Sequence, residues 1–484
     1  MMKTIFTLLG NPFRSGKGID LPLVLVFSVI NVLVLVNACL HDPRIGYDAH
    51  HHLRYIQALS ELRLVTIGDS KQFYCPPLPY IFPSLLMSLT GIQLFWAAKF
   101  GQILNFFLSL GLSLFLLKTC DLVNARPELK LGSLMFLGIL PVYYKSFAFI
   151  RGEPLIAFWG MVILYYAVLM SIRKAFTIRN AAILGVAMGL CALSRQFGIL
   201  LLPSVFLFLG YQWFHYTDQR HAIAKTFCIC LLLISIISGW FYASLKFRYG
   251  AYTIRNMESA ASFSFSNQPL QFYIGLSPDL LFSKPVRPNF PNQLLPIFYS
   301  ETWGDYWNYF TVYAIDTRES RFVSGSTLSR IISEGNRPDW FKTNHDTISN
   351  YLGRVNLISI FPSALAFIGI LFAAVQVARR TRNPLVLYPA ELAVLPLLSV
   401  MTSLAGYLWF IIMHINLAEG DTIKATYVLQ IFPFVALLVG CFLDYVCKRS
   451  RFLYWLIIGG LFMSFVHNIP AMLTHYSLPR LLMF

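Results

Sequence analysis

The chain has 484 residues, of which 57% are hydrophobic and only 12% are charged. Because soluble domains carry about 25% charged residues, this composition excludes a water-exposed globular protein. The net charge of +16 would suggest nucleic acid in a soluble protein, but most of the short basic clusters lie between apolar runs, where they set membrane orientation. We therefore expect no nucleic acid among the partners.

Apolar runs close to the roughly 20 residues that cross a hydrocarbon layer recur along the whole chain. The sequence therefore predicts an all-α polytopic membrane protein with about 11 spans. The expected spans are residues 21–40, 92–117, 131–149, 154–172, 181–194, 197–213, 225–244, 355–378, 387–413, 425–446 and 452–470. A shorter apolar stretch at 78–91 begins with several prolines and is expected to form an interfacial or re-entrant helix.

Alternate connections between these spans carry clusters of Lys and Arg, and with this span count all of them fall on the side of the basic N-terminus. By the positive-inside rule that side is the cytoplasm. We divide the chain into an N-terminal membrane module at 1–244, a large external loop at 245–354 and C-terminal membrane helices at 355–484. The first external loop, at 41–91, is the expected catalytic segment.

This first external loop holds the candidate catalytic carboxylate. Asp48 directly follows the first expected span and precedes a pattern that suits a helix from Ala49 to about Leu62. One interpretation is that Asp48 caps this helix; the other is that its carboxylate deprotonates an acceptor at the membrane boundary. His51 and His52 lie one helical turn away, so a divalent metal is a secondary interpretation beside simple packing near the site.

Four further charged residues stand on the same side of the membrane. Arg151 and Glu153 flank the turn before the fourth span, and Glu153 either compensates a helix dipole or faces the same cavity as Asp48. Arg195 lies between two spans, where it either anchors at the interface or contacts an anion. Lys424 opposes the positive-inside trend at the start of a span, which either a nearby phosphate or snorkelling to the interface would explain.

These positions together resemble the lipid-dependent glycosyltransferases of the GT-C superfamily, nearest to the branch that includes protein mannosyltransferases and the aminoarabinose transferase of lipid A. The likeness covers residues 20–240 well and 414–445 moderately, and it rests on the order of the motifs. They are Tyr47-Asp48-Ala49-His50, Phe73-Tyr74-Cys75-Pro76-Pro77-Leu78, Arg151-Gly152-Glu153-Pro154, and Lys424-Ala425-Thr426-Tyr427 followed by Phe432-Pro433. The chain departs from the family at Glu153, where many members have Asp, and at Thr426, where an Arg is common.

The resemblance implies that a sugar moves from a polyprenyl- or dolichyl-phosphate donor to a hydroxyl of a glycan, lipid or protein acceptor, with inversion, at the external face. It implies Asp48 as the general base and Glu153 as a second catalytic carboxylate, with cations on the leaving phosphate. The substrate-binding residues that follow from it are Tyr47, His51, His52, Arg54, Tyr74, Arg151, Arg195, Trp303, Lys424 and Tyr427, with Trp307 as a further sugar-stacking candidate. No cofactor is firmly implied.

A secondary transporter or lipid flippase is the main alternative; a glycan polymerase or ligase and an inactive scaffold are others. Transporters usually place ionisable residues near the bilayer midplane, whereas here they gather at one external face, with Lys99 and Lys145 as exceptions. The external loops contain no Asn-x-Ser/Thr sequon, which favours a bacterial inner membrane with a periplasmic site. The endoplasmic reticulum membrane is the alternative location.

Overall fold

The computed structural model describes residues 12–15, 18–255, 260–290, 292–335, 337–380, 390–414 and 422–477. Within these ranges, nine helices are long and apolar enough to cross a membrane. A tenth span results if the bent helix pair α6 (Pro127–Gly138) and α7 (Pro141–Ala148) crosses as one unit. The chain is a multi-pass membrane protein, as its composition predicts.

The first half of the chain alternates long candidate spans with shorter helices. Besides α6 and α7, its elements are β1 (Arg14–Ser15), β2 (Gly18–Ile19), α2 (Leu21–Leu40), α3 (Ala49–Ser60), α4 (Leu78–Thr90), α5 (Leu94–Leu122), α8 (Glu153–Ile172), α9 (Ile178–Ser194), η1 (Gln196–Leu201), α10 (Leu202–His215), η2 (Thr217–Gln219), α11 (Arg220–Ile234), the π-helical η3 (Ser235–Gly239) and α12 (Trp240–Tyr249). The 13-residue α4 is apolar but too short to cross, which agrees with the expected short helix at 78–91.

The second half begins with short elements and ends in long helices. The short elements are η4 (Phe265–Asn267), α13 (Leu270–Ile274), α14 (Pro278–Ser283), α15 (Leu294–Trp303), β3 (Ala314–Asp316), β4 (Arg321–Phe322), α16 (Gly325–Glu334) and β5 (Phe341–Thr343). The remaining elements are α17 (His345–Ile358), α18 (Ile360–Arg380), α19 (Ala390–Met413), η5 (Ala425–Val428), α20 (Ile431–Arg449) and α21 (Arg451–Met472).

The structure alters two of the expected spans. The stretch expected at 131–149 is divided into α6 and α7, whose axes differ by 64°, because Pro141 cannot continue the hydrogen-bond ladder of α6. The expected span at 181–194 falls in α9, which has 17 residues, short of the roughly 20 needed for a full crossing. The count of 11 spans therefore stays a prediction, and nine to ten are found among the described residues.

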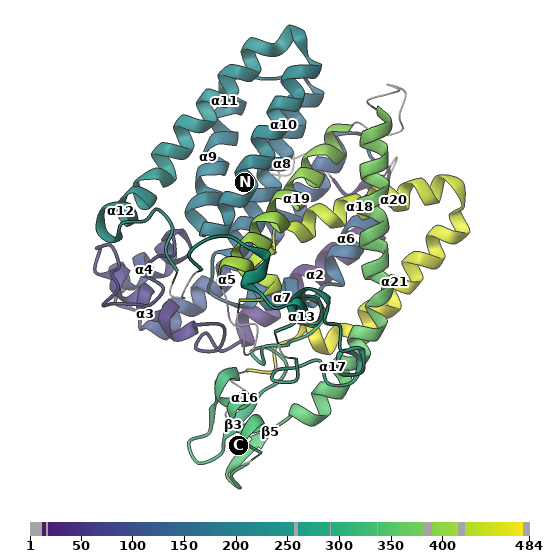
Figure 1. Ribbon diagram of the computed structural model, residues 1–484. Helices are drawn as coiled ribbons and strands as arrows, with labels where there is room; N and C mark the ends of the chain where they lie inside the picture. Colours follow the sequence, from purple (N-terminus) through teal and green to yellow (C-terminus); the bar gives the residue numbers. More distant parts are fainter. Residues whose placement is uncertain are drawn as a thin grey trace.

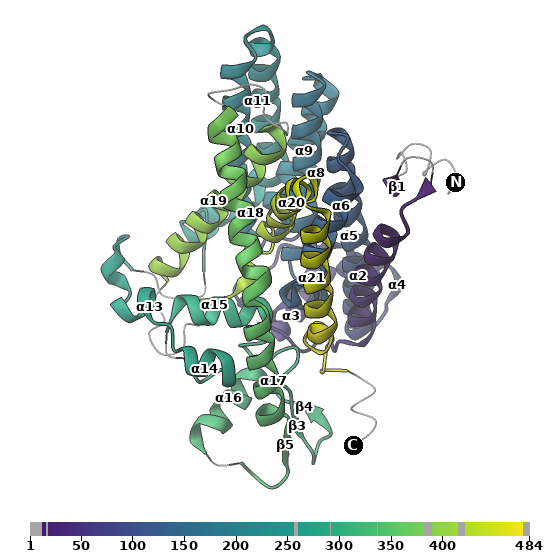
Figure 2. The same cartoon turned by 90° about the vertical axis from the view of Figure 1, so that its right-hand side faces the viewer.

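The boundaries of the large external loop also differ from the expected 245–354. α12 continues to Tyr249, and α17 already begins at His345 as the first part of a 35-residue candidate span that includes α18. Between them lie short helices and a three-stranded antiparallel sheet of order β4-β3-β5. Figures 1 and 2 show this part gathered at the lower end of the helical bundle.

The bundle is held together by close helix contacts and by buried polar groups. α20 lies directly against α6, and a Cβ added at Gly440 would stand only 2.7 Å from the carbonyl oxygen of Leu129. Small residues allow backbones in a membrane to approach in this way. After α21 the chain returns to the external loop, where the Tyr476 hydroxyl donates to the carbonyl oxygens of Asn308 and Val312, both at 2.9 Å.

Candidate functional site

The end of α2 is fixed by a lysine from the next spanning helix. The Lys99 ammonium on α5 donates to the carbonyl oxygens of Ala38, Cys39 and His41 at 2.5–3.2 Å. These carbonyls are among those that the end of a helix leaves without partners. The chain that leaves α2 is therefore held a few residues before Asp48.

Asp48 has a backbone conformation that is uncommon for its residue type. Its φ is +55°, in the left-handed region, which residues other than glycine seldom adopt. Its side chain makes no capping hydrogen bond to α3; its backbone carbonyl instead accepts the N–H groups of His51 and His52 at 2.8 and 3.1 Å. The capping interpretation is therefore wrong. Strained backbone of this kind is common at functional sites, and here it leaves the carboxylate available for other contacts.

The Asp48 carboxylate lies at a cleft formed by segments that are distant in sequence. Gln72 donates to it from Nε2, at 3.1 Å from Oδ2. The residues that line the cleft are Asp48, Gln72, Tyr74, Cys75, Arg195, Gln196, Phe197, Arg255, Phe410 and Tyr427. Asp48 thus shares one cleft with three of the predicted binding residues, Tyr74, Arg195 and Tyr427.

Glu153 lies between two buried arginines beside this cleft. Its carboxylate is 3.1 Å from Nη2 of Arg151 and 3.3 Å from Nε of Arg195. All three residues are at most 6% exposed. Their approach requires Gly152, because a Cβ at that position would overlap the carbonyl oxygen of Ser194 at the end of α9. Glu153 therefore holds two guanidinium groups at the start of α8, and the cluster keeps an excess positive charge.

Tyr427 and Tyr47 join these cations to the remaining predicted segment. Around the Tyr427 ring centroid, the Arg195 guanidinium lies at 5.2 Å, that of Arg151 at 5.6 Å and the Lys424 ammonium at 5.6 Å. Tyr47, adjacent to Asp48, has Arg151 at 5.1 Å and Lys424 at 5.3 Å from its ring. Cations at this range are attracted by aromatic faces. Four segments expected to meet from sequence are thus in contact.

The cations also change the protonation of their neighbours. Burial alone would raise the pKa of Tyr427, but Lys424, Arg151 and Arg195 together outweigh this effect and hold its pKa below the usual 10. Burial is the largest cause of a His52 pKa well below 6.5, and the two arginines lower it further. His52 is therefore neutral near pH 7 and adds no charge to the site.

Arg255 is a cleft residue that no sequence pattern indicated. It lies in the irregular segment after α12, and its guanidinium is 5.0 Å from the rings of both Phe197 and Phe410. The charged side chains described around the cleft have a formal net charge of +2, from four cations and two carboxylates. They are Arg151, Arg195, Arg255, Lys424, Asp48 and Glu153. Such a site favours a dianionic group such as a phosphate.

Two predicted binding residues lie elsewhere. Arg54 is exposed on α3 and does not line the cleft. Trp303 is packed in the core, 3% exposed, with its Nε1 donating to Ser363 at 3.0 Å. Its place is taken by Trp307, whose ring lies 5.2 Å from the Lys424 ammonium. The tryptophan that contacts the site therefore lies after the end of α15, and the tryptophan inside that helix does not contact it.

The histidines of α3 have packing contacts. The ring centroids of His50 and His51 are 3.8 Å apart, and Nδ1 of His52 shares a 2.6 Å hydrogen bond with the Tyr80 hydroxyl. In the part of the chain that the structure describes, no group of three or more His, Cys, Asp or Glu residues is placed to hold a metal. A metal bound between Asp48 and these histidines would therefore have no third His, Cys, Asp or Glu ligand among the described residues.

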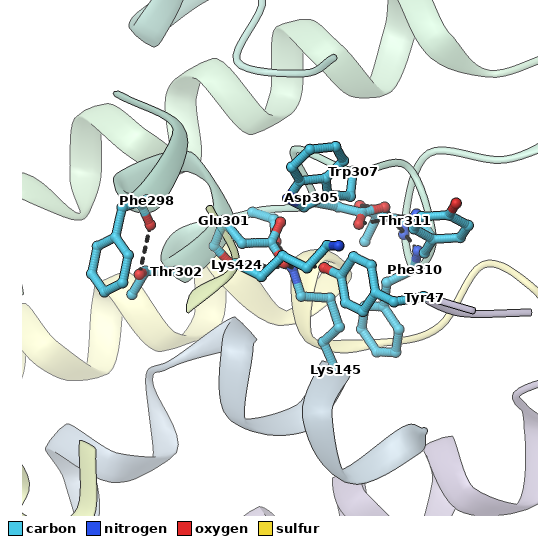
Figure 3. A network of polar contacts seen from close by, with 12 residues as sticks. Tyr47, Lys145, Phe298, Glu301, Thr302, Asp305, Trp307, Phe310, Thr311 and Lys424 are labelled. Carbon is cyan, nitrogen blue, oxygen red and sulfur yellow. Dashed lines mark hydrogen bonds and ion pairs between the residues drawn. The ribbon is translucent and has the colours of Figure 1, made fainter. Parts of the chain in front are cut away.

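A second buried network supports the site from the external loop (Figure 3). Lys145 on α7 lies 2.7 Å from a carboxylate oxygen of Glu301 on α15, and both side chains are fully buried. The Tyr47 hydroxyl donates to the same carboxylate. Asp305, a few residues later, accepts the backbone N–H groups of four residues at 2.7–3.1 Å. The external loop is thus attached to the membrane helices immediately beside Asp48.

Comparisons with known proteins give a likeness to solved structures and no match in sequence. No family model and no curated protein sequence matches the chain. A crystal structure of ArnT from Cupriavidus metallidurans bound to undecaprenyl phosphate aligns with a TM-score of 0.44 and 13% identity, over 89% of this chain and 61% of that one. The apo form of the same protein aligns with a TM-score of 0.37 and 12% identity, over 93% and 76%.

The chain is similar in structure to ArnT. The chain spans about 61% of the length of the ArnT chain bound to undecaprenyl phosphate.

Replacing Glu153 by Gln is expected to destabilise the protein. The change leaves two buried guanidinium groups without their counter-charge, and breaking a buried ion pair in this way costs about 3–5 kcal/mol. Thermal unfolding in detergent should show a clearly lower midpoint than for the wild type. Glu61→Gln, which removes an exposed partner of Arg63, is the matched control and should leave the midpoint unchanged. Equal midpoints for the two variants would contradict the ion-pair role of Glu153.

Proposed function

We propose that the chain is a glycosyltransferase that moves a sugar from a polyprenyl- or dolichyl-phosphate donor to an acceptor hydroxyl. Asp48 is the general base, and the reaction inverts the anomeric carbon. The observation that supports this most is the shared cleft of Asp48 and Arg195, with Arg151 and Lys424 around the ring of Tyr427. One carboxylate among several buried cations suits an acceptor that loses a proton and a leaving group that gains negative charge.

The reaction follows from this arrangement. The acceptor hydroxyl attacks the anomeric carbon and gives its proton to the Asp48 carboxylate. On the opposite side of that carbon, the bond to the phosphate oxygen breaks, and the phosphate leaves with the electron pair. Arg195, Arg255 and Lys424 stabilise the charge that develops there. Glu153 acts by positioning Arg151 and Arg195 and does not accept the proton, because its carboxylate is already paired with both.

The position of the cleft suits a donor that is part lipid. Its residues come from the segments on either side of α3, from the turn between α9 and α10, from the segment after α12, and from α19 and η5. In the proposed orientation these lie on the external face, so the lipid tail stays in hydrocarbon while the phosphate enters the cleft. Residues 1–244 form the catalytic membrane module, the external loop covers the site, and 355–484 contribute Lys424 and Tyr427. We place the protein in a bacterial inner membrane, with the endoplasmic reticulum as the alternative.

Binding of a lipid phosphate tests this proposal. Wild-type protein in lipid nanodiscs should bind undecaprenyl phosphate, and Arg255→Gln should weaken the binding about tenfold, as expected for the loss of one charge-assisted hydrogen bond. Arg195→Gln should weaken it at least as much. Arg248→Gln, an exposed arginine on α12, is the matched control and should bind like the wild type. Wild-type affinity in both cleft variants would show that lipid phosphate does not bind there.

A further inference from the structure

Gln72 connects the Asp48 carboxylate to a buried thiol. Its side-chain Nε2 donates to Asp48 Oδ2 at 3.1 Å, and its Oε1 accepts the Cys75 thiol, with Sγ at 3.0 Å. Gln72 is 2% exposed and Cys75 3% exposed. All three residues line the cleft. The chain of contacts therefore runs from the thiol through the amide to the base, without solvent between them.

The orientation of the Gln72 amide is set by the chemistry of its two partners, Asp48 and Cys75. A carboxylate only accepts hydrogen bonds, so the amide nitrogen of Gln72 must face Asp48. The amide oxygen then faces Cys75, which must donate. Burial raises the pKa of the Cys75 thiol, so the thiol keeps the proton that it donates. With the amide turned round, the side-chain oxygen of Gln72 would face the Asp48 carboxylate, and two hydrogen-bond acceptors would meet.

The backbone around Gln72 is fixed independently of its side chain. Its N–H donates to the Ser70 hydroxyl at 3.1 Å, and this hydroxyl donates to the carbonyl oxygen of His51 on α3 at 2.7 Å. The N–H of Cys75 donates to the carbonyl oxygen of Gln72 at 2.8 Å. Gln72 and Cys75 are thus attached to the helix that Asp48 precedes, so their positions relative to the carboxylate are defined.

We propose that Gln72, oriented by Cys75, is a positioning residue that holds Asp48 Oδ2 and aims Oδ1 at the acceptor hydroxyl. This inference rests on the proposed function of Asp48 as the base. Within the described chain, Gln72 is the one hydrogen-bond partner of the Asp48 side chain. Because Asp48 does not cap α3, nothing else described there limits rotation of the carboxylate. A base whose second oxygen is held in place loses less entropy when it meets the acceptor.

Kinetics of the Gln72 variants test the proposal in the full-length protein, with a lipid-phosphate-linked sugar as donor. Gln72→Leu should lower kcat about tenfold or more while KM for the donor changes little, because the lost contact acts on the base and not on the phosphate. The acid limb of the pH–rate profile should move to higher pH, since a hydrogen bond to the charged carboxylate is lost. The other titratable and charged groups around Asp48 are unchanged in this variant. They are His51, Arg151, Arg195, Arg255, Tyr309, Lys424 and Tyr427.

Cys75 supplies a second, milder variant. Cys75→Ser keeps a donor toward the amide oxygen and should retain most activity, whereas Cys75→Ala should lose about threefold or more with the same direction of shift in the acid limb. Gln57→Leu on the exposed side of α3 and Cys228→Ala on α11, also exposed, are the matched controls. Both should behave like the wild type in kcat and in unfolding temperature.

Two outcomes would overturn the inference and leave the proposed function standing. In one, Gln72→Leu has wild-type kcat. In the other, kcat falls but the acid limb does not move, which is the result expected of a purely structural residue. Full activity of Asp48→Asn would instead reject the proposed function itself, so the two failures are distinguishable.

Discussion

Asp48→Asn is expected to abolish sugar transfer while leaving donor binding intact. The amide keeps the shape of the carboxylate but cannot accept the proton of the acceptor, and loss of a general base lowers kcat by about 10²–10⁴-fold. The cations of the cleft are unchanged, so undecaprenyl phosphate should bind at least as well as in the wild type. The measurement is transfer of a radiolabelled sugar from a lipid-phosphate donor, with donor affinity determined on the same preparation.

Asp69→Asn is the matched control for this result. Asp69 belongs to the same external loop and is paired with Arg63, and it does not line the cleft. Its replacement should leave kcat close to the wild-type value. A transporter or flippase would survive Asp48→Asn unless Asp48 bound the solute. Transfer at the wild-type rate in Asp48→Asn would therefore exclude Asp48 as the base.

Lys145→Met is expected to cause a large loss of stability. The ammonium donates to the Glu301 side chain at 2.7 Å and to the carbonyl oxygens of Glu301 and Gly304, both at 3.1 Å. These contacts use all three of its donors. Burial raises the pKa of Glu301, and Lys145 opposes that effect. Removing the lysine leaves a buried carboxylate without its partner, at a cost of about 3–5 kcal/mol. The midpoint of thermal unfolding in detergent should fall accordingly.

A double variant separates loss of the pair from loss of volume. Lys145→Met with Glu301→Gln removes both charges, so it should recover a substantial part of the lost stability. Lys174→Met removes one partner of the exposed pair with Asp218 and should leave the midpoint unchanged, because exposed pairs contribute little. If Lys145→Met unfolded like Lys174→Met, the buried pair would not attach the external loop to α7.

The sequence predicts on which side of the membrane the candidate site lies. Short basic connections determine which span ends share a side, and this alone predicts that Asp48, Glu153, Arg195 and Lys424 lie at one face. How closely they approach depends on how the spans pack: Glu153 pairs with Arg195, Arg195 and Lys424 both lie over the ring of Tyr427, and Asp48 lines the same cleft as Arg195 and Tyr427. The role of Glu153 could not be predicted from the sequence. Its pairing with two arginines depends on the close approach of α8 and α9 at Gly152.

Gln72 and Arg255 could not be found in the sequence, because both lie in irregular segments without periodicity. Such segments have no repeating pattern that fixes the direction of a side chain. Trp303 and Trp307 were both candidates, and the sequence could not distinguish them, because α15 ends at Trp303 and Trp307 lies in the irregular segment that follows. The bend between α6 and α7 does have a signal, Pro141, but the hydropathy of the stretch masked it.

A structure of the protein with undecaprenyl phosphate bound would test the central claim most directly. We expect the phosphate within hydrogen-bond distance of Arg195, Arg255 or Lys424, with the lipid tail running into the membrane and Asp48 facing the oxygen that carries the sugar in the donor. A phosphate bound more than about 15 Å from Asp48 would contradict the account, because a general base acts only at hydrogen-bond range.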